Sequence, residues 1–178
     1  RQSYGVGGYL ESPLNDLLPV DSEIVDPLRR RTVAEVLSID TSESMGACHC
    51  GGGNMGPFQG GSDQGGINKT DISRAAAERT ISALSANDEI GVLAWNSTAE
   101  WVIPLQALPP ADVVDQGLRS LQPAGNTDMR DSLSAAAEAL LASDAELKHI
   151  ILFTDGFTAE AAIDRATDEA AELFATYG

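Results

Sequence analysis

Basic side chains, aromatic side chains and long apolar runs are all scarce in this sequence of 178 residues. The 11 Lys and Arg are outnumbered by 27 Asp and Glu, so the formal charge is −16. This charge argues against nucleic acid as a partner, because phosphates are bound through Lys and Arg, and against direct contact with an anionic membrane surface. No apolar run approaches the roughly 18 residues of a candidate membrane-spanning helix, so we expect no insertion of this segment into a membrane.

Cysteine is nearly absent as well: Cys48 and Cys50, on either side of His49, are the only two. They are too few and too close together for a disulfide framework. A soft-metal or redox site at Cys48-His49-Cys50 is one hypothesis, but a structural zinc site normally has four ligands at wider spacing. The role of these three residues stays open, and so does the redox compartment.

The rest of the composition indicates one domain with a hydrophobic core, since 43% of the residues are apolar. Residues 1–31 are irregular, with scattered Gly and Pro, and predict an extended leader. A glycine-rich loop is expected at 46–66. Hydrophobic patterning predicts strands at 32–39, 89–96, 99–105 and 149–154, and helices at 72–86, 110–121, 128–142 and 159–175.

This order of elements predicts an α/β fold over residues 32–178: a doubly wound, mostly parallel sheet flanked by helices. The run TVAEVLSI, at 32–39, is typical of an interior strand, because only Glu35 and Ser38 interrupt it. Thr70 or Asp71 is expected to cap the helix that starts at 72.

Oxygen-bearing side chains gather where two of the predicted strands end. The stretch VLSIDTSESM places Asp40, Ser42 and Ser44 at every second position, the loop GNTD carries Thr127, and the strand ILFTDG ends in Asp155. Ligands of doubly wound sheets bind outside the carboxyl ends of the strands. Each segment alone is also typical of an ordinary cap or turn, but three that meet at one edge favour a site for Mg²⁺ or Mn²⁺, with Ca²⁺ as a further candidate.

Asp40-x-Ser42-x-Ser44, Thr127 and Asp155 in Thr-Asp-Gly closely resemble the metal-ion-dependent adhesion site of von Willebrand factor type A domains, over roughly residues 32–175. The resemblance implies that Ser42, Ser44 and Thr127 bind the metal directly and that Asp40 and Asp155 bind mainly through water. It also implies that a partner protein's Asp or Glu takes the open coordination position. The expected function is recognition without turnover.

Two departures accompany this resemblance. Glu43 stands where the family often has Gly and adds a carboxylate beside the site, which either points to solvent or reduces the metal's pull on an acidic ligand. The type A fold also usually continues with two further strands after the last helix predicted here. We therefore expect a C-terminally truncated sheet in which strand 149–154 is an exposed edge, covered by the leader or by a second copy of the chain.

The leader carries a second resemblance. SYGVGGYLESPLNDLLPVD, residues 3–21, is similar to the segment before the adhesion-type domain in large bacterial membrane proteins that also have a glutamine-amidotransferase-like domain. The chain also begins at Arg1 without an initiator Met. We therefore expect a soluble, extracytoplasmic segment of a membrane-anchored protein. The alternative function is a metal-free structural or assembly scaffold of such a protein.

Enzymatic hypotheses fit less well. An amidotransferase-type nucleophile at Cys48 or Cys50 needs a strained turn between strand and helix and a base supplied from elsewhere in the fold, and a glycine-rich loop offers neither. A phosphatase with an aspartyl nucleophile would have its second acid at the position of Ser42. We therefore predict that the domain is not an enzyme.

Overall fold

The computed structural model describes residues 31–47, 67–156 and 160–177, and from Thr32 onward the chain forms one compact unit. Residues 1–30 of the expected leader and 48–66 of the expected glycine-rich loop lie outside the described residues. The elements are β1 (Val33–Asp40), the short 3-10 helix η2 (Glu43–Gly46), α1 (Lys69–Ser82), β2 (Glu89–Trp95), β3 (Ala99–Ala107), α2 (Ala111–Ser120), α3 (Arg130–Ala142), β4 (Leu147–Phe153) and α4 (Glu160–Tyr177).

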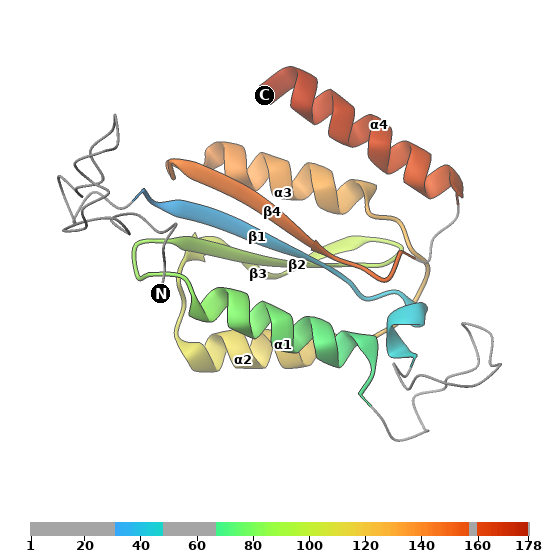
Figure 1. The fold of residues 1–178 in the computed structure, drawn as a ribbon, viewed down its shortest axis with the longest axis horizontal. Helices are drawn as coiled ribbons and strands as arrows, with labels where there is room; N and C mark the ends of the chain where they lie inside the picture. The colour runs from blue at the N-terminus through green and yellow to red at the C-terminus, as the bar shows by residue number, and fades with distance from the viewer. Residues whose placement is uncertain (1–30, 48–66, 157–159, 178) are drawn as a thin grey trace, which may run out of the picture. The chain divides into compact units, whose positions relative to one another are not determined.

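The four strands form one sheet in the order β3-β2-β1-β4. β1 is parallel to β2 and to β4, and β2 and β3 form an antiparallel hairpin. Helices α1 and α2 cover one face of the sheet, while α3 and α4 lie on the other side (Figure 1). This arrangement confirms the expected α/β fold with a mostly parallel sheet between helices.

β1 is an interior strand, since it pairs with β2 on one side and with β4 on the other. Both of its faces are buried, as its near-continuous apolar run predicts. Leu37 and Ile39 belong to the core under α1 and α2, whereas Ala34 and Val36 belong to the core under α3. This alternation follows from the two-residue period of a strand. The carboxyl end of β1 is thereby held between two packed layers, which fixes the position of Asp40 and of the turn that follows it.

The first turn of α1 is tied to the segment that follows β1. Asn68 caps the helix, since its side chain accepts from Asp71 N at 2.8 Å and the Asp71 side chain accepts from Asn68 N at 3.4 Å. Neither Thr70 nor Asp71 is the cap, so that prediction was wrong: the reciprocal capping box starts the helix at Lys69. The Thr70 hydroxyl instead donates to Met45 O at 3.1 Å and fastens α1 to η2.

The two edges of the sheet differ. β3 carries an exposed proline, Pro104, and its pairing with β2 shifts register, both of which hinder the addition of a further strand. β4 pairs with β1 and, in the described part of the chain, with no other strand; its Ile150 and Leu152 are 36% and 40% exposed. β4 is therefore the open edge that the sequence predicts, and its covering by the leader or a second copy stays a prediction.

A carboxyl group also lies in the middle of β1, away from its carboxyl end. Glu35 is 8% exposed, its neighbours in register are Ile90 on β2 and His149 on β4, and its Oε1 has no hydrogen-bond partner among the described residues. Burial raises the pKa of Glu35; His149 lowers it in part and Asp88 raises it further. The interior strand thus contains a group whose charged form is unfavourable in the fold.

None of the helices that the structure describes combines the length and the apolar character needed to cross a membrane.

Candidate functional site

Asp40 ends β1 and lies completely buried at the carboxyl edge of the sheet. Its Oδ1 accepts from Ser42 N at 2.8 Å, and its Oδ2 accepts from the Thr154 hydroxyl at 2.8 Å. Burial raises the pKa of Asp40, the hydrogen bonds from Ser42 and Thr154 lower it, and nearby Asp155 raises it. The carboxyl group is therefore held in one orientation at a position where a cation would stabilise its charged form.

The two serines follow in the turn that leads from β1 into η2. Ser42 and Ser44 are buried, and their Oγ atoms are 3.1 Å apart. Ser42 is extended at the start of η2, and Met45 N donates to Ser42 O at 3.0 Å. This tight turn points both hydroxyls toward the same place.

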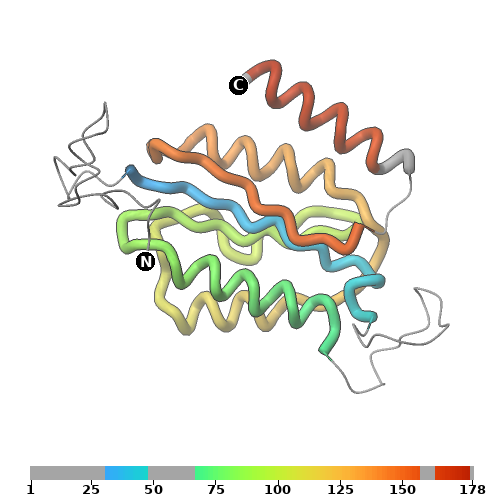
Figure 2. The backbone as a smooth tube through the Cα atoms, in the orientation of Figure 1, coloured from blue at the N-terminus to red at the C-terminus, as the bar shows by residue number. Residues whose placement is uncertain are grey.

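Asp155 reaches the serines from the end of β4. The Ser44 hydroxyl donates to Asp155 Oδ1 at 3.3 Å, so residues 111 positions apart in sequence meet at this edge. Figure 2 shows the ends of β1 and β4 side by side, as their parallel pairing requires. The structure thus brings together Asp40, Ser42, Ser44 and Asp155, four of the five side chains singled out in the sequence.

Thr127, the fifth, lies half-buried in the loop between α2 and α3. Ala124 N donates to Thr41 O at 2.7 Å, Glu43 N donates to Gly125 O at 3.1 Å and Asp128 N donates to Asn96 O at 2.7 Å. Gly125 has a φ of +76°, a conformation that glycine adopts without strain. These backbone bonds hold the loop directly against the turn that carries the serines.

The donor set suits a small hard cation. An octahedral ion with metal–oxygen distances of about 2.0–2.1 Å sets neighbouring ligand oxygens about 2.9 Å apart, close to the 3.1 Å between Ser42 Oγ and Ser44 Oγ. A serine hydroxyl that offers a lone pair to a cation still has its proton to donate, and Ser44 donates it to Asp155. The residues therefore fit Mg²⁺ or Mn²⁺, with the hydroxyls as direct ligands and the carboxylates behind them.

The described residues contain no group of three or more His, Cys, Asp and Glu side chains placed to share a metal. This leaves a set dominated by hydroxyls at the strand ends. Cys48, His49 and Cys50 lie outside the described residues, so the soft-metal hypothesis stays a prediction. Glu43 is exposed, as expected of a side chain that points to solvent, and its effect on a bound metal stays a prediction.

Two further residues of the candidate site are not among those predicted from the sequence. Thr154 holds Asp40, and Lys69 donates to Asp155 Oδ2 at 2.7 Å. Thr154 had a signal, since it stands in the Thr-Asp-Gly motif one residue before Asp155. Lys69 had none, because only the folded position of the first turn of α1 brings it to the end of β4.

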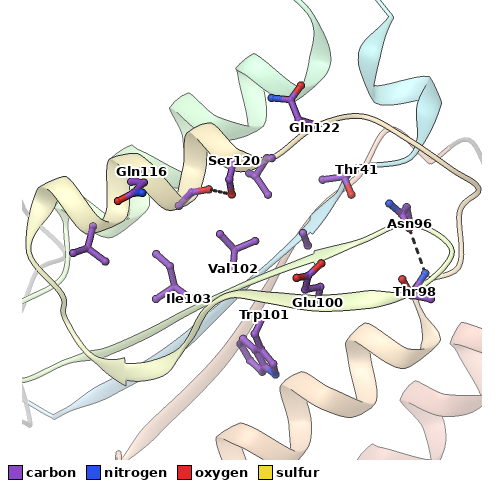
Figure 3. A pocket seen from close by; sticks show the side chains of 14 residues that line it. Thr41, Asn96, Thr98, Glu100, Trp101, Val102, Ile103, Gln116, Ser120 and Gln122 are labelled. Atoms are coloured by element: carbon purple, nitrogen blue, oxygen red, sulfur yellow. Dashed lines mark hydrogen bonds between the residues drawn. The ribbon is translucent and has the colours of Figure 1, made fainter.

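A cavity of about 650 Å³ opens next to this edge, between α2 and the β2–β3 hairpin (Figure 3). Thr41, which directly follows Asp40, lies at one end of it, and Gln116 on α2 lies toward the other. Amide and hydroxyl side chains line much of the wall, among them Asn96, Thr98 and Ser120. A ligand bound at the strand ends would thus have a hydrogen-bonding surface beside it.

Residues 36–157 match the von Willebrand factor type A domain, a span that includes all five site residues and more than half of the chain. The chain belongs to the von Willebrand factor type A family. Domains of this family mediate protein–protein interaction and are typically not enzymes. No curated protein matches the sequence.

Solved structures with the same fold include pilus proteins. The PilB minor pilin from Streptococcus sanguinis is 24% identical with a TM-score of 0.60, over 74% of this chain and 31% of that one. The vWF domain of the type V pili tip protein Mfa5 from Porphyromonas gingivalis is 23% identical with a TM-score of 0.52, over 72% and 39%.

A von Willebrand factor type A protein from Catenulispora acidiphila is 21% identical with a TM-score of 0.56, over 79% of this chain and 30% of that one. This type A domain therefore spans between about a third and two fifths of the length of these three structures. At such identities the likeness shows the fold alone.

Proposed function

We propose that this type A domain is a divalent-metal-dependent protein-interaction module. Mg²⁺ or Mn²⁺ would be held by Ser42, Ser44 and Thr127, with Asp40 and Asp155 binding mainly through water. The observation that supports this most strongly is the hydroxyl pair 3.1 Å apart, placed between two carboxylates at the carboxyl ends of adjacent parallel strands. A metal bound there supplies an electrophilic coordination position for an Asp or Glu of the partner.

The chain's own residues would hold the metal and leave one coordination position open for the partner's acidic group. Asp40 fixes the turn by accepting from Ser42 N, and Thr154 holds the second oxygen of the same carboxylate. Ser42 and Ser44 are neutral, so they would not cancel the positive charge presented to the ligand. The carboxylates, kept mainly at the distance of a water molecule, would favour cation entry without filling the open position.

The partner's acidic group must approach a chain whose formal charge is −16. Long-range repulsion would slow the approach, and the cation at the strand ends would reverse the sign of the field locally. The cavity beside Thr41 offers amides and hydroxyls to residues that flank the acidic group. The pilus neighbours support an interaction role in general terms only, because their likeness is one of fold.

The second candidate function is a metal-free structural or assembly scaffold. The Lys69 ammonium, 2.7 Å from Asp155 Oδ2, favours it because the chain itself then supplies a positive charge to the site. The membrane-anchored parent with an amidotransferase-like domain, and its extracytoplasmic location, stay predictions. Residues 3–21, which carry that resemblance, lie outside the described residues.

Titration calorimetry with MgCl₂ and MnCl₂ separates the two functions. We expect one saturable site in the wild type and its loss in a Ser42→Ala, Asp155→Ala double variant. The matched control is Ser82→Ala with Asp144→Ala, which removes an exposed serine and an exposed aspartate remote from the strand ends. Absence of binding in a folded wild type, or equal binding in the two double variants, would contradict the metal-dependent function and favour the scaffold.

A further inference from the structure

Lys69 is the one described basic side chain that forms a salt bridge with a proposed metal-site residue. Its Nζ lies 2.7 Å from Asp155 Oδ2, while Asp155 Oδ1 accepts from the Ser44 hydroxyl. The side chains of Lys69 and Asp155 are 21% and 7% exposed, so the pair is largely shielded from water. One carboxylate is thus shared between the ammonium and the hydroxyl pair.

The position of this lysine is fixed by the fold. The capping box of Asn68 and Asp71 sets the first turn of α1, and Thr70 bonds η2, which carries Ser44. Lys69 N also donates to Ala47 O at 3.4 Å, just after η2. The first turn of α1 is therefore tied to the turn that carries the serines, and this places the Lys69 ammonium against Asp155.

The location is also unfavourable for a cation on local grounds. Lys69 is the first residue of α1, and the amino-terminal end of a helix carries partial positive charge that disfavours lysine there. Asp155 offsets this repulsion. The salt bridge with Asp155 therefore stabilises Lys69 more than an ordinary surface salt bridge would, since without Asp155 the ammonium faces only the positive end of the helix.

A divalent cation and this ammonium would compete for the negative charge of one carboxylate, whose Oδ2 accepts from Lys69 while its Oδ1 accepts from Ser44. A metal bound to Ser42 and Ser44 would face Asp155 Oδ1, the oxygen that accepts from the Ser44 hydroxyl. Its two positive charges would repel the Lys69 ammonium, because the two cations would lie close together and partly shielded from water. We propose that Lys69 is a built-in competitor of the metal: its ammonium neutralises Asp155 in the metal-free domain and must leave Asp155 when the divalent ion binds.

This proposal rests on the proposed metal-dependent function and adds a regulation to it. The domain in its metal-free state is electrostatically satisfied, so loading requires a metal concentration high enough to displace a tethered cation. Removal of the ammonium should raise the affinity for Mg²⁺ and Mn²⁺ by at least about tenfold, which corresponds to about 1.4 kcal/mol.

The test compares Lys69→Met, which keeps the length and removes the charge, with Lys69→Arg, which keeps the charge. The control is Lys148→Met, because Lys69 and Lys148 are the only lysines in the sequence and Lys148 is exposed on β4. Calorimetry should show the tenfold gain for Lys69→Met alone. Equal affinities in the wild type, Lys69→Met and Lys148→Met would overturn the competitor role while leaving the metal-dependent function in place.

A second measurement needs no variant. With both lysines carrying isotope-labelled side chains, the NMR signal of the Lys69 side chain should move as Mg²⁺ saturates the site, and that of Lys148 should stay fixed. A Lys69 signal that does not move at saturation would overturn the competitor role. If no protein binds metal in calorimetry and neither signal moves, both the metal-dependent function and the competitor role are overturned.

Discussion

Replacement of Glu35 by leucine should stabilise this domain. The carboxyl group lies 8% exposed on the central strand, beside the apolar core that contains Leu37 and Ile90, and its Oε1 has no partner among the described residues. A buried polar group left unpaired costs about 1–3 kcal/mol. Leucine removes that cost and extends the core, so the free energy of unfolding at pH 7 should rise by about 1–3 kcal/mol.

The attraction of His149 reduces this gain, since it lowers the pKa of Glu35 and is lost with the carboxyl group. We therefore expect the lower half of the range. For a domain of 150–250 residues, about 1 kcal/mol changes the melting temperature by roughly 2–4 °C. The difference is large enough for thermal unfolding followed by circular dichroism.

The gain should also depend on pH in a defined direction. The folded-state pKa of Glu35 is raised above its ordinary value of 4.5, so the folded chain holds this proton more tightly than the unfolded chain does. The part of the penalty that comes from the charge is absent below pH 4.5 and develops as the pH rises through the folded-state pKa of Glu35. The stability difference between Glu35→Leu and the wild type should therefore be largest at pH 7–8 and should shrink toward pH 4.

Glu100→Gln is the control, because Glu100 is exposed on β3 and its replacement removes the same charge from an acidic protein. It should change stability by less than about 0.5 kcal/mol. A destabilised Glu35→Leu variant, or a gain that is the same at pH 8 and pH 4, would refute the reasoning.

Three further predictions concern packing, capping and the open edge. Gly91→Ala should destabilise the domain by about 1–3 kcal/mol in urea unfolding, because the new Cβ would lie 2.8 Å from Trp101 Cζ3; an unchanged midpoint would contradict this packing. Asn68→Ala should cost about 1 kcal/mol in the same assay, since it removes the cap of α1, and a Ser82→Ala control should cost less. Self-association through strand 149–154 should appear in sedimentation velocity and weaken in Leu152→Lys, because lysine on an edge strand opposes pairing; a wild type that stays monomeric at all concentrations would contradict it.

The sequence predicted the elements of this fold well because its patterns are local. The apolar run at 32–39 and the polar residues at its end gave both the central strand and the turn that follows. The start of α1 was misplaced by three residues because Asn68, Thr70 and Asp71, three of four consecutive positions, all have capping side chains. The reciprocal bonds between Asn68 and Asp71 decide among them, and these depend on coordinates.

The part of the candidate site that lies at the strand ends could be predicted, because the carboxyl ends of neighbouring parallel strands meet at one edge of the sheet. Parallel pairing of β1 with β4 requires Asp40 and Asp155 to lie at one edge, so the motif residues could be grouped without coordinates. The salt bridge between Lys69 and Asp155 joins residues 86 positions apart, one of them in the first turn of α1. No periodic pattern in the sequence predicts it. The unpaired Oε1 of Glu35 could not be predicted from the sequence either, because it depends on the absence of a hydrogen-bond donor next to this buried carboxyl group among the described residues.

The unequal edges of the sheet have a consequence for how larger assemblies could form. Growth of the sheet is one-sided: Pro104 and the shifted register oppose addition at β3, whereas β4 has exposed Ile150 and Leu152 and no proline. β4 also leads directly into Thr154 and Asp155. A strand added beside β4 would therefore end or begin next to Asp155, so that assembly of the sheet would take place directly beside the proposed metal site.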